Sequence, residues 1–386
     1  MIKAIINATV VTVSGEELSG ATVILKDGKI HSVGAVEIPN GAEVIDGRGK
    51  FLSPGLVDAH THLGVSTEGA PAEFYDHNDK SASVLPELRI VDSLYPGDPG
   101  FEDARMGGVT TVQTLPGSAD VVGGTGVIIK TVGNVADKMV IVAPSSMKAA
   151  LGENPIRVFQ GKSGLPSTRM GCAACLRKAL SDAQSYVAER TEKEKEGKFF
   201  KRDLAMEQMA LVVEGKIPLS VHAHRADDIC TAIRVAEEFK VPYTIEHCTE
   251  GHLIEEFLAE KSVKAAIGPL NTSRRKMELV NRSWELPVAL ERQGIHFCII
   301  TDHPVIPISD LILETALAVK AGLGAKTAMR AITLSAAEHL GIGHRVGSID
   351  EGKDGDLVLW SGHPLDFDSH VEMTFIDGEL VYKRDI

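Results

Sequence analysis

The run SPGLVDAHTH, residues 53–62, contains the most informative pattern in the sequence. It passes from a turn into a short apolar strand over residues 56–58 and ends with His60 and His62. Residues two apart on a strand point to the same side. The two imidazoles therefore face the same way at the carboxyl end of a strand, which is where (β/α)8 barrels carry their catalytic residues.

The same arrangement recurs at three further predicted strand ends. The side chains that follow these strands are His222, His224, His247, Asp302 and His303. Neutral imidazole and carboxylate are suitable ligands for Zn²⁺ and similar divalent ions. Four separate strand ends that each deliver such side chains predict a metal site rather than a set of unrelated surface histidines.

The middle of the chain alternates between predicted strands and amphipathic helices. The strand candidates are residues 56–58, 109–113, 139–142, 219–222, 243–246, 263–267 and 297–301. This alternation favours a parallel sheet with helical crossovers, whereas both chain ends contain short strands joined by hairpin turns. We therefore predict an α/β fold: a (β/α)8 TIM barrel over residues 55–343, and a small β-sandwich domain formed by both chain ends, residues 1–54 and 344–386.

Composition narrows the classes of function. The 386-residue chain has a formal net charge of -13, and such a negative field disfavours binding to nucleic acid or to an anionic membrane surface. No membrane-spanning apolar stretch and no signal peptide is expected. The five cysteines lack regular spacing, so we expect reduced thiols in a cytoplasmic protein. Cys172 and Cys175 form a CxxC pair, but their surroundings predict buried thiols on a helix rather than a zinc or redox site.

Taken together, SPGLVDAHTH, SVHAH, TIEHC and TDHP resemble the metal-ligand motifs of the amidohydrolase superfamily, most closely its imidazolonepropionase-like and prolidase-like branch. GKIHSVG near the start and GSIDEGKDGDLVLWSGHPL near the end are similar to the composite β domain of that family. The resemblance implies a metal-dependent hydrolase that cleaves a C–N bond of an amide, cyclic amide or dipeptide by attack of a metal-bound hydroxide. It also implies a small-molecule substrate, a homo-oligomer as one option, and one or two divalent ions, Zn²⁺ first, with Fe²⁺ or Mn²⁺ as alternatives.

The resemblance also assigns roles to individual residues. The expected metal ligands are His60, His62, Lys148, His222, His247 and Asp302. Asp302 is expected to be a catalytic proton shuttle as well. His224 lies two residues after His222 on the same strand face, so either could be the ligand; the family pattern favours His222 and leaves His224 to orient substrate or to stabilise an oxyanion. His303 is expected to make supporting hydrogen bonds.

A second metal ion requires a bridging carboxylate. Many family members use a carboxylated lysine at the end of the fourth strand, and Lys148 follows the strand predicted at residues 139–142. Lys130 is the rival position, Glu153 could ligate instead, and Lys148 could be an ordinary loop lysine. The sequence therefore leaves open whether one ion or two are bound.

Two alternatives belong to other classes of function. Deaminases of the superfamily typically have a glutamate three residues after the histidine of the fifth strand, where this chain has Arg225 or Asp227. A non-catalytic scaffold should have lost metal ligands, yet the expected positions hold ligating residues. The loops at residues 64–78 and 116–126 are expected to shape a substrate pocket, and Arg225, Arg274 and Arg275 are candidate partners for a substrate carboxylate, with ordinary solvated charges as the alternative.

Overall fold

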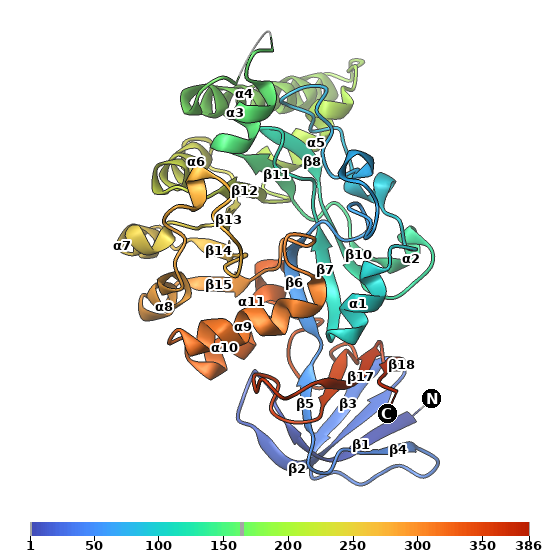
Figure 1. Ribbon diagram of the computed structural model, residues 1–386. Coiled ribbons are helices and arrows are strands. Elements are labelled where there is room, and N and C mark those ends of the chain that lie inside the picture. The colour runs from blue at the N-terminus through green and yellow to red at the C-terminus, as the bar shows by residue number, and fades with distance from the viewer. Residues whose placement is uncertain (1, 163–165, 386) are drawn as a thin grey trace.

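The computed structural model describes residues 2–162 and 166–385, and it has an α/β architecture with three β-sheets (Figure 1). An eight-stranded sheet built from both ends of the chain lies at one end of the molecule. The other two sheets come from the middle of the chain, and most of the helices lie around them.

The eight-stranded sheet brings the two ends of the chain together. Its strands are β1 (Ile2–Val10), β2 (Leu18–Lys26), β3 (Lys29–Gly34), β4 (Glu43–Asp46), β5 (Phe51–Pro54), β16 (Leu357–Trp360), β17 (Val371–Ile376) and β18 (Glu379–Lys383). The N-terminal and C-terminal strands meet where β5 pairs antiparallel with β16. Both predicted hairpin turns have two successive residues with positive φ, at 27–28 and 377–378, as two-residue hairpins require.

The second and third sheets supply the strands that carry the histidines. The second contains β6 (Leu56–Thr61), β7 (Val109–Thr114), β9 (Val127–Lys130) and β10 (Val140–Val142). The third contains β8 (Val122–Thr125), β11 (Met147–Ala150), β12 (Leu219–Ala223), β13 (Tyr243–His247), β14 (Lys264–Ile267) and β15 (His296–Ile299). β6 is parallel to β7, and β11 to β15 are all parallel, so their carboxyl ends lie on one side.

The expected alternation of parallel strands and helices is interrupted between β7 and β11. Here β9 pairs antiparallel with β7, and β8 pairs antiparallel with β11. The strand predicted at residues 139–142 is β10, which pairs antiparallel with β9 at the sheet edge. The parallel strand at this point of the chain is β11, and the prediction missed it because Met-Lys-Ala-Ala lacks the β-branched and aromatic residues that mark strands.

Backbone hydrogen bonds connect the two middle sheets at both of their edges. After β15, the amide of Asp302 donates to the carbonyl of His60 at 3.2 Å, and the amide of His62 donates to the carbonyl of His303 at 2.8 Å. On the other side, Gly126, between β8 and β9, exchanges two hydrogen bonds of 2.9 Å with Ser145 and Ser146. The ends of β6 and β15 are thereby held side by side.

The helices cover the outer side of the middle sheets (Figure 1). They are α1 (Gly100–Met106), α2 (Ala136–Met139), α3 (Glu153–Phe159), α4 (Arg169–Lys195), α5 (Leu204–Val213), α6 (Ala226–Phe239), α7 (Glu255–Glu260), α8 (Glu285–Arg292), α9 (Leu311–Lys320), α10 (Ala325–Ala331) and α11 (Leu334–His339). Short 3₁₀ turns are η1 (Ala72–Phe74), η2 (Ile90–Ser93), η3 (Gly251–Leu253), η4 (Met277–Leu279) and η5 (Ile308–Asp310). Within residues 2–162 and 166–385, none of the helices has the length and apolar character needed to cross a membrane.

The first half of α4 packs against the rest of the protein, and its second half is charged and exposed. The Thr168 hydroxyl caps the helix by accepting a hydrogen bond of 3.1 Å from the amide of Gly171. Cys172 and Cys175 are buried free thiols on the packed half, as predicted for this CxxC pair. The cytoplasmic location expected from the cysteines stays a prediction.

Candidate metal centre

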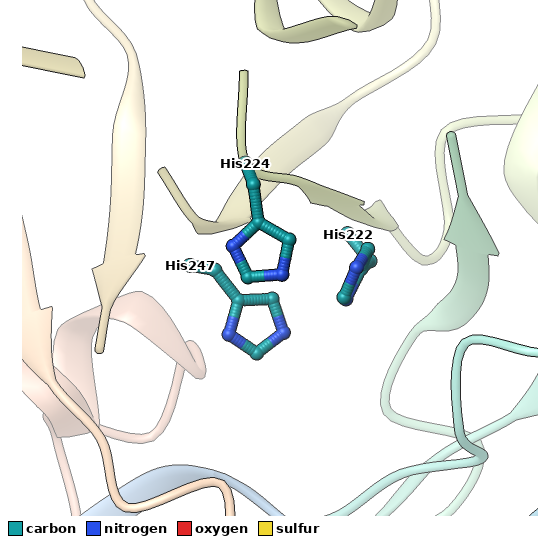
Figure 2. A group of neighbouring side chains, drawn as sticks. All are labelled: His222, His224 and His247. Atoms are coloured by element: carbon teal, nitrogen blue, oxygen red, sulfur yellow. The ribbon is translucent and has the colours of Figure 1, made fainter. Parts of the chain in front are cut away.

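The histidines and the aspartate expected from the sequence form two adjacent groups at the carboxyl ends of the strands. One group is His60, His62 and Asp302, and the other is His222, His224 and His247. In each group the ligating atoms lie within 4.8 Å of one another. Figure 2 shows the second group, in which His222 from β12 and His224, directly after β12, lie beside His247 from β13.

The two groups are in contact with each other. The ring centroids of His60 and His247, one from each group, are 4.9 Å apart. Within the second group, those of His222 and His247 are 4.4 Å apart. All five imidazoles are buried. Several buried imidazoles that lie this close together are the ligands expected for one or more divalent cations.

Asp302 connects the first group through its carboxylate. Its Oδ1 atom lies 3.4 Å from Nε2 of His62 and 3.6 Å from Nε2 of His60. Burial opposes ionisation of Asp302, but the neighbouring His247 and His62 hold the pKa of this carboxyl well below its usual value. The backbone of Asp302 is left-handed, with φ 53°, and that of His247 has φ 70°. Such strain in non-glycine residues concentrates at functional sites.

Hydrogen bonds at Nδ1 orient three of the imidazoles. Nδ1 of His62 donates to the carbonyl of Leu115 at 2.8 Å, and Nδ1 of His247 donates to the carbonyl of Gly268 at 2.7 Å. Nδ1 of His224 lies 2.7 Å from the hydroxyl of Thr249. A carbonyl oxygen can only accept, so in His62 and His247 Nδ1 carries a proton, and Nε2 is the nitrogen left to face a metal ion.

His222 differs because its Nδ1 atom is buried and has no hydrogen-bond partner among the described residues. Its Nε2 atom lies 3.4 Å from the amide nitrogen of Asn154. Burial lowers the pKa of His222 well below its ordinary value, so the ring is neutral. A neutral imidazole with an unpartnered buried nitrogen fits the role of a metal ligand, since buried polar atoms are rarely left without a partner.

Lys148 lies beside the first group. It is buried on β11, and its Nζ atom is 2.9 Å from Nε2 of His60. Burial lowers the pKa of Lys148 to about 8. The two other candidates for a bridging ligand lie differently. Lys130 forms ion pairs with Asp356 at 2.5 Å and Asp354 at 3.0 Å. Glu153 begins α3, where its backbone amide contacts Glu278.

His303 points away from the two groups, as expected for a residue with a supporting role. Its Nδ1 atom accepts a hydrogen bond of 3.2 Å from the amide of Ile308, and its Nε2 atom lies 3.8 Å from Glu68.

The three arginines considered for substrate binding are engaged elsewhere. Arg225 pairs with Asp227 at 2.9 Å on the surface, and Arg274 and Arg275 donate to nearby loop atoms. The next residue in the chain, Lys276, approaches the second group of histidines through Asn154 and also pairs with Glu278 at 3.5 Å. Its Nζ atom lies 3.2 Å from Oδ1 of Asn154, whose amide group contacts His222.

Three further residues that the sequence did not single out contribute to the site. The His77 ring stacks on that of His62 with centroids 4.7 Å apart, and Nδ1 of His77 lies 2.6 Å from the hydroxyl of Ser66. A hollow of about 470 Å³ lies along the loop after β6 and includes His77, Asn78, Pro116 and Gly123 among its lining residues. Glu246 lies beneath His60, and Asn154 links Lys276 to His222. Of these, only His77, which falls in a loop expected to shape the pocket, had any signal in the sequence.

The sequence comparison identifies the family. Residues 51–381 match the model of the Amidohydrolase family. The chain belongs to this family. The expected resemblance to the amidohydrolase superfamily is thereby confirmed, and imidazolonepropionases are among the sequence relatives of this chain.

Three known proteins illustrate how this amidohydrolase relates to others. Amidohydrolase tasK of Hapsidospora irregularis is 30% identical over 369 residues, with 89% of this chain but 38% of that protein covered. The chain therefore spans well under half the length of that relative. The imidazolonepropionase of Thermoplasma volcanium is 24% identical over 392 residues, covering 95% of this chain and 92% of that protein. The crystal structure of an amidohydrolase from Thermotoga maritima MSB8 superposes with a TM-score of 0.97 at 41% identity, covering 99% and 100% of the two chains. The expected enzyme class, a hydrolase acting on C–N bonds, is the class of these homologues.

Proposed function

We propose that this amidohydrolase hydrolyses the C–N bond of an amide, cyclic amide or dipeptide at a divalent metal centre formed by the two groups of histidines and Asp302. The observation that carries the proposal is the contact between these groups, with Lys148 2.9 Å from His60. Binuclear centres require a ligand that bridges two ions, and Lys148 occupies a place from which a carboxylated side chain could do so.

The donor set divides naturally between two ions. His60, His62 and Asp302 would hold one, and His222 and His247 would hold the other, with Lys148 between them. The family pattern favours His222 as the ligand of its pair, and its Nδ1 atom, which has no protein partner among the described residues, would be free to bind an ion. The nitrogen and oxygen donors favour Zn²⁺, with Fe²⁺ or Mn²⁺ as alternatives.

The protein side chains then carry the proton transfers of hydrolysis. A bound divalent ion supplies Lewis acidity, which activates water and polarises a carbonyl group near neutral pH. Asp302 accepts a proton from the attacking water as the C–O bond forms, and it delivers the proton to the nitrogen as the C–N bond breaks. His224, oriented by Thr249, donates a hydrogen bond to the developing oxyanion.

We also interpret the two middle sheets as one distorted (β/α)8 barrel over residues 55–343, and the eight-stranded sheet as part of a composite β-sandwich domain formed by residues 1–54 and 344–386. The hydrogen bonds between His60 and Asp302, and between Gly126 and Ser146, support closure of the barrel at both edges. In such a barrel, the carboxyl ends of the strands form the face that binds substrate.

Deamination by the same centre has less support. The side chains three residues after His222 and His224 are Arg225 and Asp227, which pair with each other on the surface. Neither side chain lies where it could replace the glutamate that deaminases of this superfamily typically carry. A scaffold without metal also has little support, because every expected ligand position holds a ligating side chain in one of the two groups or beside them.

The test combines metal analysis with a substrate screen. Protein purified without chelator should contain stoichiometric divalent metal and should hydrolyse at least one member of a panel of N-acyl amino acids, dipeptides and cyclic amides. Chelation should abolish the activity, and Zn²⁺ or Mn²⁺ should restore it. Hydrolysis that survives complete removal of metal would overturn the proposal, as would release of ammonia from aminopurines with no cleavage of any amide.

A further inference from the structure

A fully buried carboxylate, Glu246, lies directly beneath the first group of ligands. Its side chain has no exposed surface, and burial of a charge is costly unless the charge is paired and hydrogen-bonded. Oε2 of Glu246 lies 2.7 Å from Nδ1 of His60. Oε1 accepts a hydrogen bond of 2.6 Å from the hydroxyl of Thr244 and lies 3.7 Å from Nε2 of His339. Every partner of this carboxylate is therefore a protein side chain.

The contact with Glu246 distinguishes His60 from the other imidazoles of the two groups. Nδ1 of His62 and Nδ1 of His247 contact neutral carbonyls, and Nδ1 of His224 contacts a hydroxyl. Only His60, among the five, has a carboxylate on Nδ1 in the described structure. A carboxylate holds the proton on Nδ1, directs the lone pair of Nε2 outward, and makes that nitrogen a stronger electron donor to a metal ion than a carbonyl partner does.

The surroundings of Glu246 hold it in one place. Thr244 and Glu246 are two residues apart on β13, so their side chains share one face of the strand and the hydroxyl reaches the carboxylate. His339, at the end of α11, approaches the same oxygen, and both Thr244 and His339 help to line a hollow of about 500 Å³ at the amino ends of the strands. Strand and helix thus fix the carboxylate, and the carboxylate fixes the ring of His60.

We propose that Glu246 is a positioning residue that sets the tautomer, orientation and donor strength of His60, with Thr244 and His339 holding the carboxylate. This inference rests on the proposed metal centre. It assigns the carboxylate to the ion held by His60, His62 and Asp302, and not to the ion held by His222 and His247.

The experiment measures metal affinity directly. Apo protein is titrated with Zn²⁺ in competition with a chromophoric chelator, for the wild type and for Glu246→Gln. The glutamine keeps the shape of the side chain and an oxygen for His60 but removes the charge. Removal of a hydrogen-bond partner that orients a metal-ligating histidine weakens metal binding by roughly 10–100-fold. One Zn²⁺ should therefore bind about 10–100-fold more weakly, while the affinity for the other ion should stay within about threefold of wild type.

Glu314→Gln is the matched control, because Glu314 is a buried carboxylate that accepts hydrogen bonds from the amides of Leu270 and Asn271 rather than from a candidate ligand. It should bind both ions as the wild type does. Glu246→Asp, which keeps the charge on a shorter side chain, should recover part of the lost affinity. Unchanged affinity for both ions in Glu246→Gln, or an equal loss at both, would overturn the inference.

A second variant covers the case in which Glu246→Gln does not fold. Thr244→Val removes the hydroxyl that donates to Glu246 at nearly constant volume, and it should weaken the same ion several-fold. Unchanged affinity in Thr244→Val would then contradict the positioning role. Failure of the proposed function has a different signature, because the wild-type protein itself would then bind no Zn²⁺.

Discussion

The Nζ atom of Lys148 lies 2.9 Å from Nε2 of His60 in the interior of the protein. An ammonium group in such a place has lost its water shell and faces an imidazole that is neutral at physiological pH, since burial lowers the pKa of His60 to about 3. This contact places a lysine directly beside the first group of ligands. It is the structural basis for the bridging role proposed for Lys148.

Replacement of Lys148 by alanine should remove the bridge between the two ions. We expect the bound metal to fall from about two ions per chain to one or fewer, and kcat to fall by at least about 100-fold, because the bridge holds both ions near the reacting atoms. Elemental analysis and steady-state kinetics measure the two effects.

Lys264→Ala is the control, since Lys264 is exposed at the start of β14. Acetate or propionate, which can occupy the space left by the side chain, should restore part of the activity of Lys148→Ala. Full metal content together with normal kcat in Lys148→Ala would contradict the bridging role.

Asp302→Asn tests the proton shuttle. The amide keeps the size of the side chain but cannot accept the proton, so turnover should fall by about 100-fold or more, as loss of a general base implies. The variant should retain its fold and most of its metal, measured by circular dichroism and elemental analysis. Near-normal kcat would exclude Asp302 as the proton acceptor, whereas His60→Ala should lose the ion proposed to be held by His60, His62 and Asp302.

Lys276→Met tests whether the cation beside His222 binds the carboxylate of a substrate. Its Nζ atom contacts Asn154, which contacts His222, and it lies 3.5 Å from Glu278; the Lys276 side chain is 14% exposed. A hydrogen bond to a charged group contributes about 1.5–3 kcal/mol, so KM for a carboxylate-bearing substrate should rise by roughly 10–100-fold. KM for the corresponding uncharged amide should change little. Equal effects on the two substrates would contradict this assignment.

Lys130 provides a prediction about stability. It is buried between Asp354 and Asp356, where these carboxylates raise its pKa although burial opposes the charged form. Lys130→Met leaves the carboxylates without their buried cation, which typically costs about 3–5 kcal/mol. Urea unfolding measures the loss.

Lys29→Met is a close control for Lys130→Met. Lys29 pairs with the same Asp354 at 2.5 Å, but its side chain is 48% exposed. Removal of such a solvated partner should cost less than about 1 kcal/mol. Equal losses for the two variants would show that burial of Lys130 adds nothing to its ion pairs.

Several features of the site could be predicted because they follow from strand periodicity. His60 and His62, and likewise His222 and His224, share a strand face because they are two residues apart, and the apolar residues before them mark the strands. The hairpin turns at Asp27 and Asp377 could also be predicted, because in each turn the aspartate precedes a glycine, as two-residue hairpin turns favour.

Other features were not accessible because they depend on tertiary contacts. β11 was missed since its four residues have weak strand propensity, although the resemblance to the amidohydrolase superfamily had made Lys148, which lies on it, a candidate. In the sequence, Glu246 is simply one residue of a predicted strand, and its contact with His60 is visible only in the structure. Lys276 lies on a loop beside two arginines with the same charge. The sequence alone does not show which of the three cations contacts Asn154 and so lies near His222; in the structure it is Lys276.

The most direct test of the metal centre is the number of divalent ions per chain, measured by elemental analysis on protein purified without chelator. Two adjacent ligand groups, with Lys148 beside the first, predict about two ions per chain, and loss of at least one in Lys148→Ala. One ion per chain in the wild type would contradict the bridging role of Lys148. Fewer than about 0.1 ions per chain, with no uptake when Zn²⁺ is added to apo protein, would contradict the metal centre itself, because a chain with this donor set should bind zinc tightly.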